Sequence, residues 1–257
     1  AQAINTLPAS SENGCDSRTG GIVGILREGT VEDCRNMGII GGKHFVGGIA
    51  GQAYGSQSKQ ALISRCYSDA NVGGSGIVEW LGDSTPNGAV NGYTTVQNCY
   101  NKGSVIYGIC ESASGNGNAM FYCHHVGIFT EQPIFGSTGD GWNIDIQRCY
   151  YKGSSEFDSI DGTAYKTAEE FADGTVLALM NNGNWMQGQS HPVLAKRTGV
   201  TVRGKITSFG SDTDNITIEL YAEGSASAYY TVTVKGNTAE YSIEGVAAGT
   251  YTMKVSK

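Results

Sequence analysis

The sequence predicts an all-β protein: a right-handed parallel β-helix, or solenoid, with a short helical cap, followed by a small Ig-like antiparallel β-sandwich. Three observations support this prediction. Glycine accounts for 38 of 257 residues and proline for only four, which is typical of many short strands separated by turns. A cysteine-centred pattern recurs within residues 20–155. From residue 198 onward, apolar and polar residues alternate as in half-buried strands.

Composition argues against two classes of partner. Charged residues make up 16% of the chain and the net charge is −7, so nucleic acid is not expected as a partner. No apolar run reaches the roughly 18 residues of a membrane-spanning helix, so no membrane insertion is expected. Sparse charge with abundant Ser, Thr, Asn and Gly favours a secreted or cell-surface location. Residues 1–19, the expected N-terminal lead-in or cap, read as the start of a mature secreted chain or as an arbitrary boundary.

The repeat is visible in four segments that resemble one another. They are VEDCRNMGIIGG, ISRCYSDANVGG, VQNCYNKGSVIYG and IQRCYYKGSS, which contain Cys34, Cys66, Cys99 and Cys149. These cysteines are separated by 32, 33 and 50 residues, and periods of 20–50 residues indicate stacked structural units. A short apolar, glycine-bounded segment precedes each cysteine strand. The pattern predicts coils of parallel strands over residues 20–155.

In such a coil, equivalent inward residues stack on one another. We therefore predict that Cys34, Cys66, Cys99 and Cys149 form an interior ladder, because free cysteine packs as a small apolar residue. Gly38 is expected to turn the corner after Cys34, where a positive φ favours glycine. A redox or metal-binding role is the alternative, but it does not explain the recurrence.

The pieces GGIVG (20–24), VEDCRNMGIIGG (31–42) and VGGIAG (46–51) resemble the GLUG-motif repeats of bacterial cell-surface and secreted proteins. The resemblance covers residues 20–153, and it weakens in the third and fourth units, where the excursions lengthen. It implies a surface-exposed β-solenoid. It implies no single activity, since the motif occurs in adhesin-like proteins and beside peptidase domains.

Residues 156–197 are predicted to form a helical cap and a closing segment. Thr167 is the expected N-cap residue, and Glu170 completes a capping box. Phe171, Val176, Leu177 and Met180 then lie on one apolar helical face, and Gly183 ends the helix. We expect this segment to cover the open end of the solenoid core.

Five alternating segments over residues 198–257 predict the sandwich. The stretch YSIEGVAAGTYTMKV resembles carboxypeptidase-regulatory-like and Cna B-type sandwiches. The pattern is still running at Lys257, so either further strands follow in a longer chain or a neighbouring molecule supplies the missing edge. The second reading implies self-association through the sandwich edge. Lys205 and Glu219 resemble the partners of an isopeptide bond.

Cys110, Cys123, His124 and His125 form the densest group of soft ligands, but they lack the spacing of a zinc site, so no metal and no cofactor are expected. A Cys110–Cys123 disulfide is the preferred interpretation, and two buried reduced thiols are the alternative. Seven cysteines leave at least one thiol unpaired in a secreted chain.

Acidic residues gather in one excursion at Asp140, Asp145, Glu156, Asp158 and Asp161. No basic cluster accompanies them, so no catalytic residues are assigned and a solvated loop is preferred to a hydrolase site. Aromatic residues in the excursions suit a carbohydrate ligand better, and the candidate binding residues are Tyr54, Trp80, Tyr93 and Trp142. The alternative, favoured slightly for any single ring, is that they pack the excursions onto the solenoid. The predicted function is an adhesin-like or carbohydrate-associated module that binds a glycan or a cell-surface ligand. The alternatives are a fibre subunit completed by strand donation and a polysaccharide-degrading enzyme.

Overall fold

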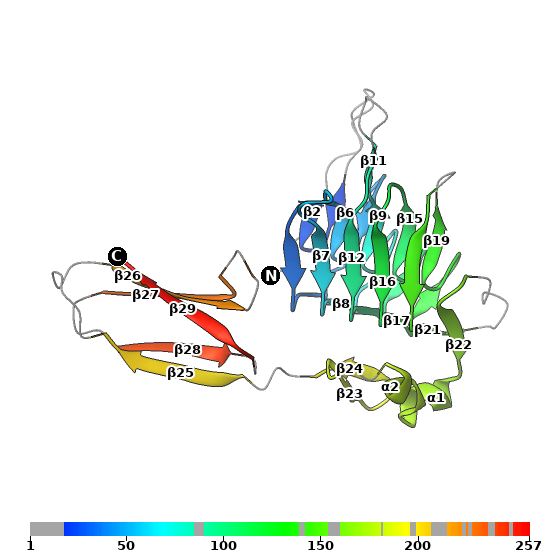
Figure 1. The fold of residues 1–257 in the computed structure, drawn as a ribbon. Helices are drawn as coiled ribbons and strands as arrows, with labels where there is room; N and C mark the ends of the chain where they lie inside the picture. Colours follow the sequence, from blue (N-terminus) through cyan, green and yellow to red (C-terminus); the bar gives the residue numbers. More distant parts are fainter. Residues whose placement is uncertain are drawn as a thin grey trace. The chain divides into compact units, whose positions relative to one another are not determined.

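Strands dominate the structure, a computed structural model, and the described residues form only two short helices among them (Figure 1). The all-β prediction is therefore confirmed. The structure describes residues 18–84, 90–138, 142–153, 160–180, 182–195, 199–206, 215–222, 225, 228–235, 240–246 and 249–257. The chain divides into two compact units, Ala1–Ala195 and Lys196–Lys257.

Unit 1 is built on three sheets in which every strand pair is parallel. The first sheet contains β2 (Val23–Arg27), β6 (Ala50–Tyr54), β9 (Val78–Leu81), β15 (Cys110–Ala113) and β19 (Phe135–Thr138). The second contains β3 (Thr30–Glu32), β7 (Ala61–Ser64), β12 (Thr94–Gln97), β16 (Asn118–Phe121) and β20 (Ile144–Gln147). The third contains β4 (Arg35–Asn36), β8 (Tyr67–Ser68), β13 (Tyr100–Asn101), β17 (His124–His125), β21 (Cys149–Lys152) and β22 (Thr163–Lys166).

The chain visits these sheets in rotation, so each strand pairs with its equivalent in the next coil. Two short parallel pairs and one antiparallel pair accompany them: β1 (Thr19–Gly20) with β5 (Val46–Gly47), β14 (Ser104–Val105) with β18 (Ile128–Phe129), and β10 (Asp83–Ser84) with β11 (Val90–Asn91). The parallel strands continue through β22, beyond residue 155 where the sequence predicts their end.

The core lies between the three sheets and consists of stacked equivalent residues. In the second sheet, Ile63, Val96 and Met120 occupy one register position and have no exposed surface. In the first sheet, Val78 and Cys110 do the same. Each buried side chain thus packs on its counterpart one coil away, about 4.8 Å along the stack.

A left-handed residue forms the corner between the second and third sheets in successive coils. These residues are Asp33, Arg65, Asn98, Tyr122 and Arg148, with φ of 51°, 52°, 52°, 54° and 54°. Each stands immediately before a cysteine. The positive-φ corner thus precedes each cysteine, and non-glycine residues make it. Gly38, predicted to turn the corner after Cys34 with a positive φ, is not among the glycines with positive φ, and its amide donates to Asn36 Oδ1.

The segment after β22 contains α1 (Ala168–Ala172), α2 (Thr175–Leu179) and an antiparallel pair of β23 (Trp185–Gln187) and β24 (Pro192–Leu194). The predicted capping box is confirmed, because Thr167 Oγ1 accepts from the Glu170 amide and Glu170 Oε2 accepts from the Thr167 amide. The single helix predicted here is broken at Gly174, which has a left-handed φ of 93°. The second helix ends at Leu179 with Met180 as its C-cap, so Gly183, whose φ is +77°, does not end the helix as predicted.

The sequence suggested that this segment covers the open end of the core, and that prediction is wrong. It packs along the outer face of the third sheet, where Phe171, Val176, Met180 and Trp185 meet Tyr100 and Tyr150 (Figure 1). The physical reason is that this outer face carries a row of aromatic rings, which would otherwise be exposed to water.

Unit 2 has two antiparallel sheets around a small apolar cluster. One sheet pairs β25 (Val200–Lys205) with β28 (Glu240–Val246). The other has the order β27 (Tyr230–Lys235), β26 (Asn215–Ala222), β29 (Tyr251–Ser256). The buried cluster contains Ile206, Ile216, Ile218, Leu220, Ile243 and Val246. The inward positions alternate along β26, as the sequence pattern predicts.

Candidate functional site

The cysteine positions form a continuous ladder, and the ladder has a member that the sequence analysis missed. Cys34, Cys66, Cys99 and Cys149 occupy equivalent corners, and Cys123 lies between the last two. The intervals are thus 32, 33, 24 and 26 residues, so the 50-residue gap contains two coils. A histidine pair follows Cys123, whereas Arg-Asn, Tyr-Ser, Tyr-Asn and Tyr-Tyr follow its equivalents, and this obscured the match.

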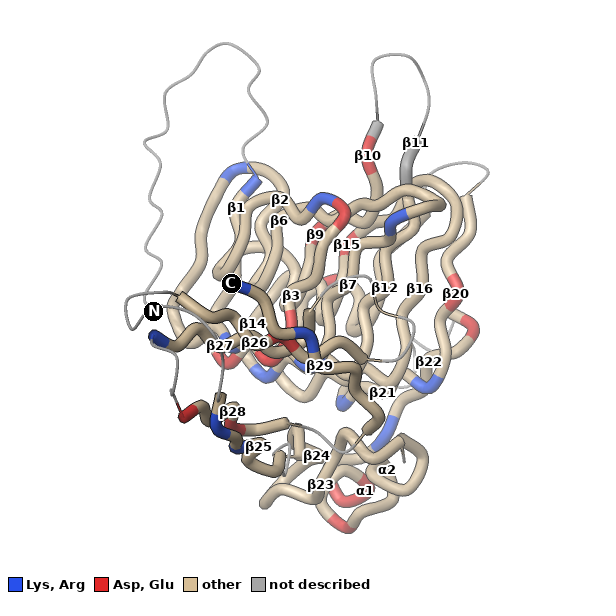
Figure 2. Tube along the Cα trace, turned by 60° about the vertical axis from the view of Figure 1, so that its left-hand side comes forward, with Lys and Arg blue, Asp and Glu red and all other residues tan. Residues whose placement is uncertain are grey.

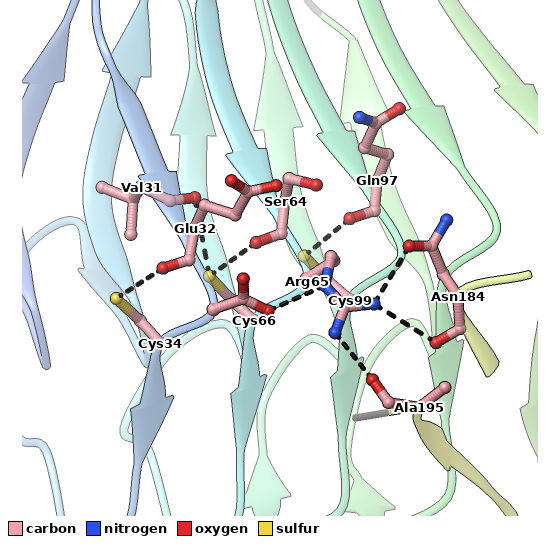
Figure 3. Close-up of polar contacts among 11 residues, drawn as sticks. Val31, Glu32, Cys34, Ser64, Arg65, Cys66, Gln97, Cys99, Asn184 and Ala195 are labelled. Carbon is pink, nitrogen blue, oxygen red and sulfur yellow. Dashed lines mark hydrogen bonds and ion pairs between the residues drawn. The ribbon is translucent and has the colours of Figure 1, made fainter. Parts of the chain in front are cut away.

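Each thiol donates to the carbonyl oxygen two residues before it. The distances from Sγ are 3.2 Å for Cys34, 3.1 Å for Cys66 and 3.2 Å for Cys99, and Figure 3 shows these three in line. Burial raises the pKa of the Cys34 and Cys123 thiols. A protonated, inward-facing thiol is a poor nucleophile and a poor metal ligand, so the ladder is structural.

The expected Cys110–Cys123 disulfide is not formed. Cys110 lies in the first sheet and Cys123 in the corner ladder before the third, and both are free thiols. The repeat that places Cys123 beside Cys99 and Cys149 explains this separation. Cys15 lies outside the described residues.

His124 and His125 point to opposite sides of β17. His125 is buried beside Asn101, with Nδ1 3.0 Å from Asn101 Nδ2, and burial lowers its pKa to about 3. His124 is buried beneath the segment that covers the third sheet, with Nε2 3.4 Å from His191 Nδ1. Burial and the nearby His191 lower the pKa of His124. Among the described residues, no three His, Cys, Asp or Glu side chains gather as a metal site.

Arg65 holds the covering segment to the sheets. Its guanidinium pairs with Asp33 at 2.7 Å and donates to Asn184 Oδ1 at 3.0 Å and to the Ala195 carbonyl at 2.8 Å (Figure 3). The left-handed corner directs this side chain outward, yet only 5% of the residue's surface is exposed to solvent. The contacts explain why a charged residue is buried here.

Trp80 is the predicted binding residue with the most elaborate surroundings. It is half-buried on β9, stacks on Phe45 with ring centroids 4.9 Å apart, and donates from Nε1 to Ser114 Oγ at 3.0 Å. The register places Ser112 beside it and Ser137 on the next strand. The outer face of the first sheet therefore presents an aromatic ring followed by two hydroxyl groups.

The other three candidate aromatics do not join Trp80 in one site. Tyr54 ends β6 beneath the Arg27 guanidinium, whose Cζ is 5.9 Å from the ring centroid. Tyr93 is a left-handed residue before β12, and its ring lies against Gly117. Trp142 is half-buried before β20 in the second sheet. Each of them has packing contacts or a separate location.

A carboxylate pair that the sequence analysis did not single out lies beside Trp80. Glu79 on β9 and Glu111 on β15 are neighbours in register, and Glu79 Oε2 accepts from the Ser75 amide at 2.7 Å. Burial, a hydrogen bond to Glu111 and its charge raise the pKa of Glu79 to about 8. Their 32-residue spacing equals the first cysteine interval, which is the signal that could have revealed the pair.

The predicted acidic excursion does not converge on such a pair. Asp140, Glu156 and Asp158 lie outside the described residues, while Asp145 and Asp161 are exposed. In unit 2, Lys205 is exposed on β25, and Glu219 belongs to the other sheet and accepts from the Tyr221 hydroxyl at 3.1 Å. Figure 2 shows the Lys and Arg residues of the described part scattered along the chain.

No family model, no curated protein and no solved structure matches this chain. Over the described residues, neither helix has the length and apolarity needed to cross a bilayer.

Proposed function

We propose that this chain is a non-catalytic binding module of a secreted or cell-surface protein, and that it binds carbohydrate on the outer face of the first sheet. The observation that carries the proposal is Trp80, whose half-buried ring is followed on successive strands by Ser112 and Ser137. An aromatic surface beside hydroxyl groups complements the apolar face and the hydroxyls of a sugar ring.

We also infer that unit 1 is a right-handed parallel β-helix. The chain rotates through three parallel sheets, and connections between parallel strands are right-handed in nearly all proteins. The antiparallel unit fits an Ig-like, Cna B-type sandwich. Together with the GLUG-like segments, these interpretations favour a bacterial surface protein that displays its ligand site on a rigid stack of coils.

The cysteines are compatible with a secreted location. Of the six described thiols, Cys34 alone is half-buried and the other five are buried, so an oxidant has poor access to all of them except Cys34.

The test is binding of residues 1–257 to an array of host glycans and plant polysaccharides, with reducing-end release followed in the same wells. We expect saturable binding without release. Trp80→Ala should weaken binding about tenfold or more, equivalent to about 1.4 kcal/mol, because the stacking surface is lost. Trp142→Ala, a matched change at a ring that precedes β20 and lies apart from Trp80, should leave binding intact. Undiminished binding by Trp80→Ala or release of reducing ends contradicts the proposal.

A second candidate function is a structural subunit of an extracellular assembly. The observation that favours it is β29, which pairs only with β26 among the described strands and leaves Met253 and Val255 41% and 51% exposed. An open edge of this kind can pair with a strand from a neighbour. Concentration-dependent elongated polymers in light scattering and electron microscopy would support it. A monomer at all concentrations excludes it, and polymers that Val255→Lys leaves unchanged exclude the β29 edge as their interface.

A further inference from the structure

Glu79 and Glu111 belong to a repeated arrangement in the first sheet. Each stands four residues after a corner residue, Ser75 for Glu79 and Tyr107 for Glu111, and these corners are bridged to each other. The register puts Gly51 beside Glu79 and Gly136 beside Glu111. Gly51, Glu79, Glu111 and Gly136 thus occupy one register position on four successive strands. Because glycine has no side chain, only the two carboxylates project from this position in the described strands.

Among the residues that the structure describes, no Lys, Arg or His pairs with Glu79 or Glu111. The ring of Tyr107 lies in the field of three carboxylates, those of Glu79, Glu111 and Glu131. Two hydrogen-bonded carboxyl groups without a compensating charge form a concentrated source of oxygen ligands.

Ser75 provides an independent observation. The residue has no exposed surface, its amide donates to Glu79 Oε2 at 2.7 Å, and its hydroxyl lies beside the same carboxylate. Yet this hydroxyl completes no hydrogen bond within the described residues. A buried hydroxyl without a partner is costly, and a ligand at the carboxylate pair would satisfy it.

We propose that Glu79, Glu111 and Ser75 form a binding site for a divalent cation, and that Ca²⁺ is the ion it fits best. The three side chains offer only oxygen atoms, which suits a hard cation, whereas zinc sites favour nitrogen and sulfur. Ca²⁺ takes six to eight oxygens in flexible geometry, so water completes a shell begun by two carboxylates and a hydroxyl. Mg²⁺ demands stricter octahedral geometry and is expected to bind more weakly.

The arrangement also argues against glycoside hydrolysis at this pair. The carboxyl groups of glycosidases stand about 5 Å or more apart, to leave room for the sugar or for water. Glu79 and Glu111 are close enough to share a hydrogen bond, so a single small ion fits between them better than a glycosidic bond. The cation site does not depend on the carbohydrate proposal, although it lies next to Trp80.

The experiment is calorimetric titration of the full 257-residue chain with CaCl₂, together with Tb³⁺ luminescence excited through Trp80 and Tyr107. We expect one saturable site with a dissociation constant of roughly 10⁻⁴–10⁻³ M, the range of extracellular Ca²⁺ modules. Glu79→Gln and Glu111→Gln should each weaken binding about tenfold or more, because each removes one charge while keeping a hydrogen-bonding side chain. Ser75→Ala should weaken it by a smaller factor.

Asp145→Asn is the matched control, since it removes an exposed carboxylate from the second sheet of the same unit. Its affinity for Ca²⁺ should equal that of the unaltered chain. The proposal is overturned if no saturable binding occurs, or if both glutamine variants, folded by circular dichroism, bind as the unaltered chain does. If one variant fails to fold, the other decides the result.

Discussion

At the scale of single residues, the corner before each cysteine combines a strained backbone with a buried side chain. A non-glycine residue in the left-handed region costs on the order of 1 kcal/mol, and the coils accept this cost repeatedly. The cysteine that follows fills the interior, and its thiol satisfies a carbonyl at the end of the preceding strand. Backbone strain and side-chain packing are therefore coupled at every coil.

The ladder predicts graded thiol reactivity. In a Cys15→Ser background, Cys34 should react with a thiol reagent in the native protein, because it is half-buried at the start of the ladder. Cys66 and Cys99 should react only after unfolding, since neither has exposed surface. Mass spectrometry after timed labelling measures the order. Labelling of Cys99 as fast as Cys34 would contradict the ladder.

At the scale of elements, the segment that covers the third sheet rests on buried rings that must stay neutral. Tyr67, Tyr100 and His124 stack with centroids 4.7 and 5.1 Å apart, and His191 approaches from the covering segment. Burial lowers the pKa of both histidines, and the positive charges of Lys102 and Lys152 add to the shift at His191. The side chain of Asp69 acts in the opposite direction there.

This arrangement predicts acid sensitivity. A depressed pKa in the folded state means that the unfolded chain binds more protons, so stability is fully present above the unfolded value, about 6.5, and falls below it. Below that pH, the free energy of unfolding falls by about 1.4 kcal/mol per pH unit for each histidine that stays neutral in the folded state. Urea unfolding at pH 7 and pH 5 should show a smaller loss for His124→Phe than for the unaltered chain.

The pKa shift of Glu79 changes stability with pH in the opposite direction to the histidines, so its contribution has to be removed before the histidines are compared. Its raised pKa, about 8, means that its contribution is complete below about 4.5 and is lost as the pH rises toward 8. The comparison is therefore made in a Glu79→Gln background, where the raised pKa of Glu79 no longer offsets the effect of the histidines between pH 5 and 7. An identical pH dependence with and without His124 would refute the assignment.

At the scale of the whole molecule, two units with separate cores share one chain. Ile63 lies in the core of unit 1 and Ile218 in that of unit 2, and neither has exposed surface. We expect two unfolding transitions. Ile63→Ala and Ile218→Ala, a matched pair, should each lower one transition by about 2–5 kcal/mol and leave the other unchanged. Calorimetry measures both, and a single transition shifted by either variant would mean cooperative unfolding.

The sequence predicts the coils where a rare residue type recurs at regular intervals. Cys34, Cys66 and Cys99 indicate the repeat because cysteine is uncommon and their intervals are nearly equal. Glu79 and Glu111 repeat with the same interval, but two glutamates draw no attention until the register places them side by side.

The position of the covering segment could not be predicted for another reason. The strands of the third sheet are mostly two residues long, so each contributes a single outward side chain, such as Tyr67 or Tyr100. One residue in every coil is too sparse to reveal an apolar face in the sequence.

The unequal coils have a consequence for how such a chain can change over generations. The left-handed corner and its cysteine recur after 32, 33, 24 or 26 residues, so the register of the strands does not depend on the length between them. Insertions and deletions can accumulate in the excursions while the corners are conserved. Selection for folding and selection for surface recognition then act on different residues of the same coil, and new specificities can arise without loss of the scaffold.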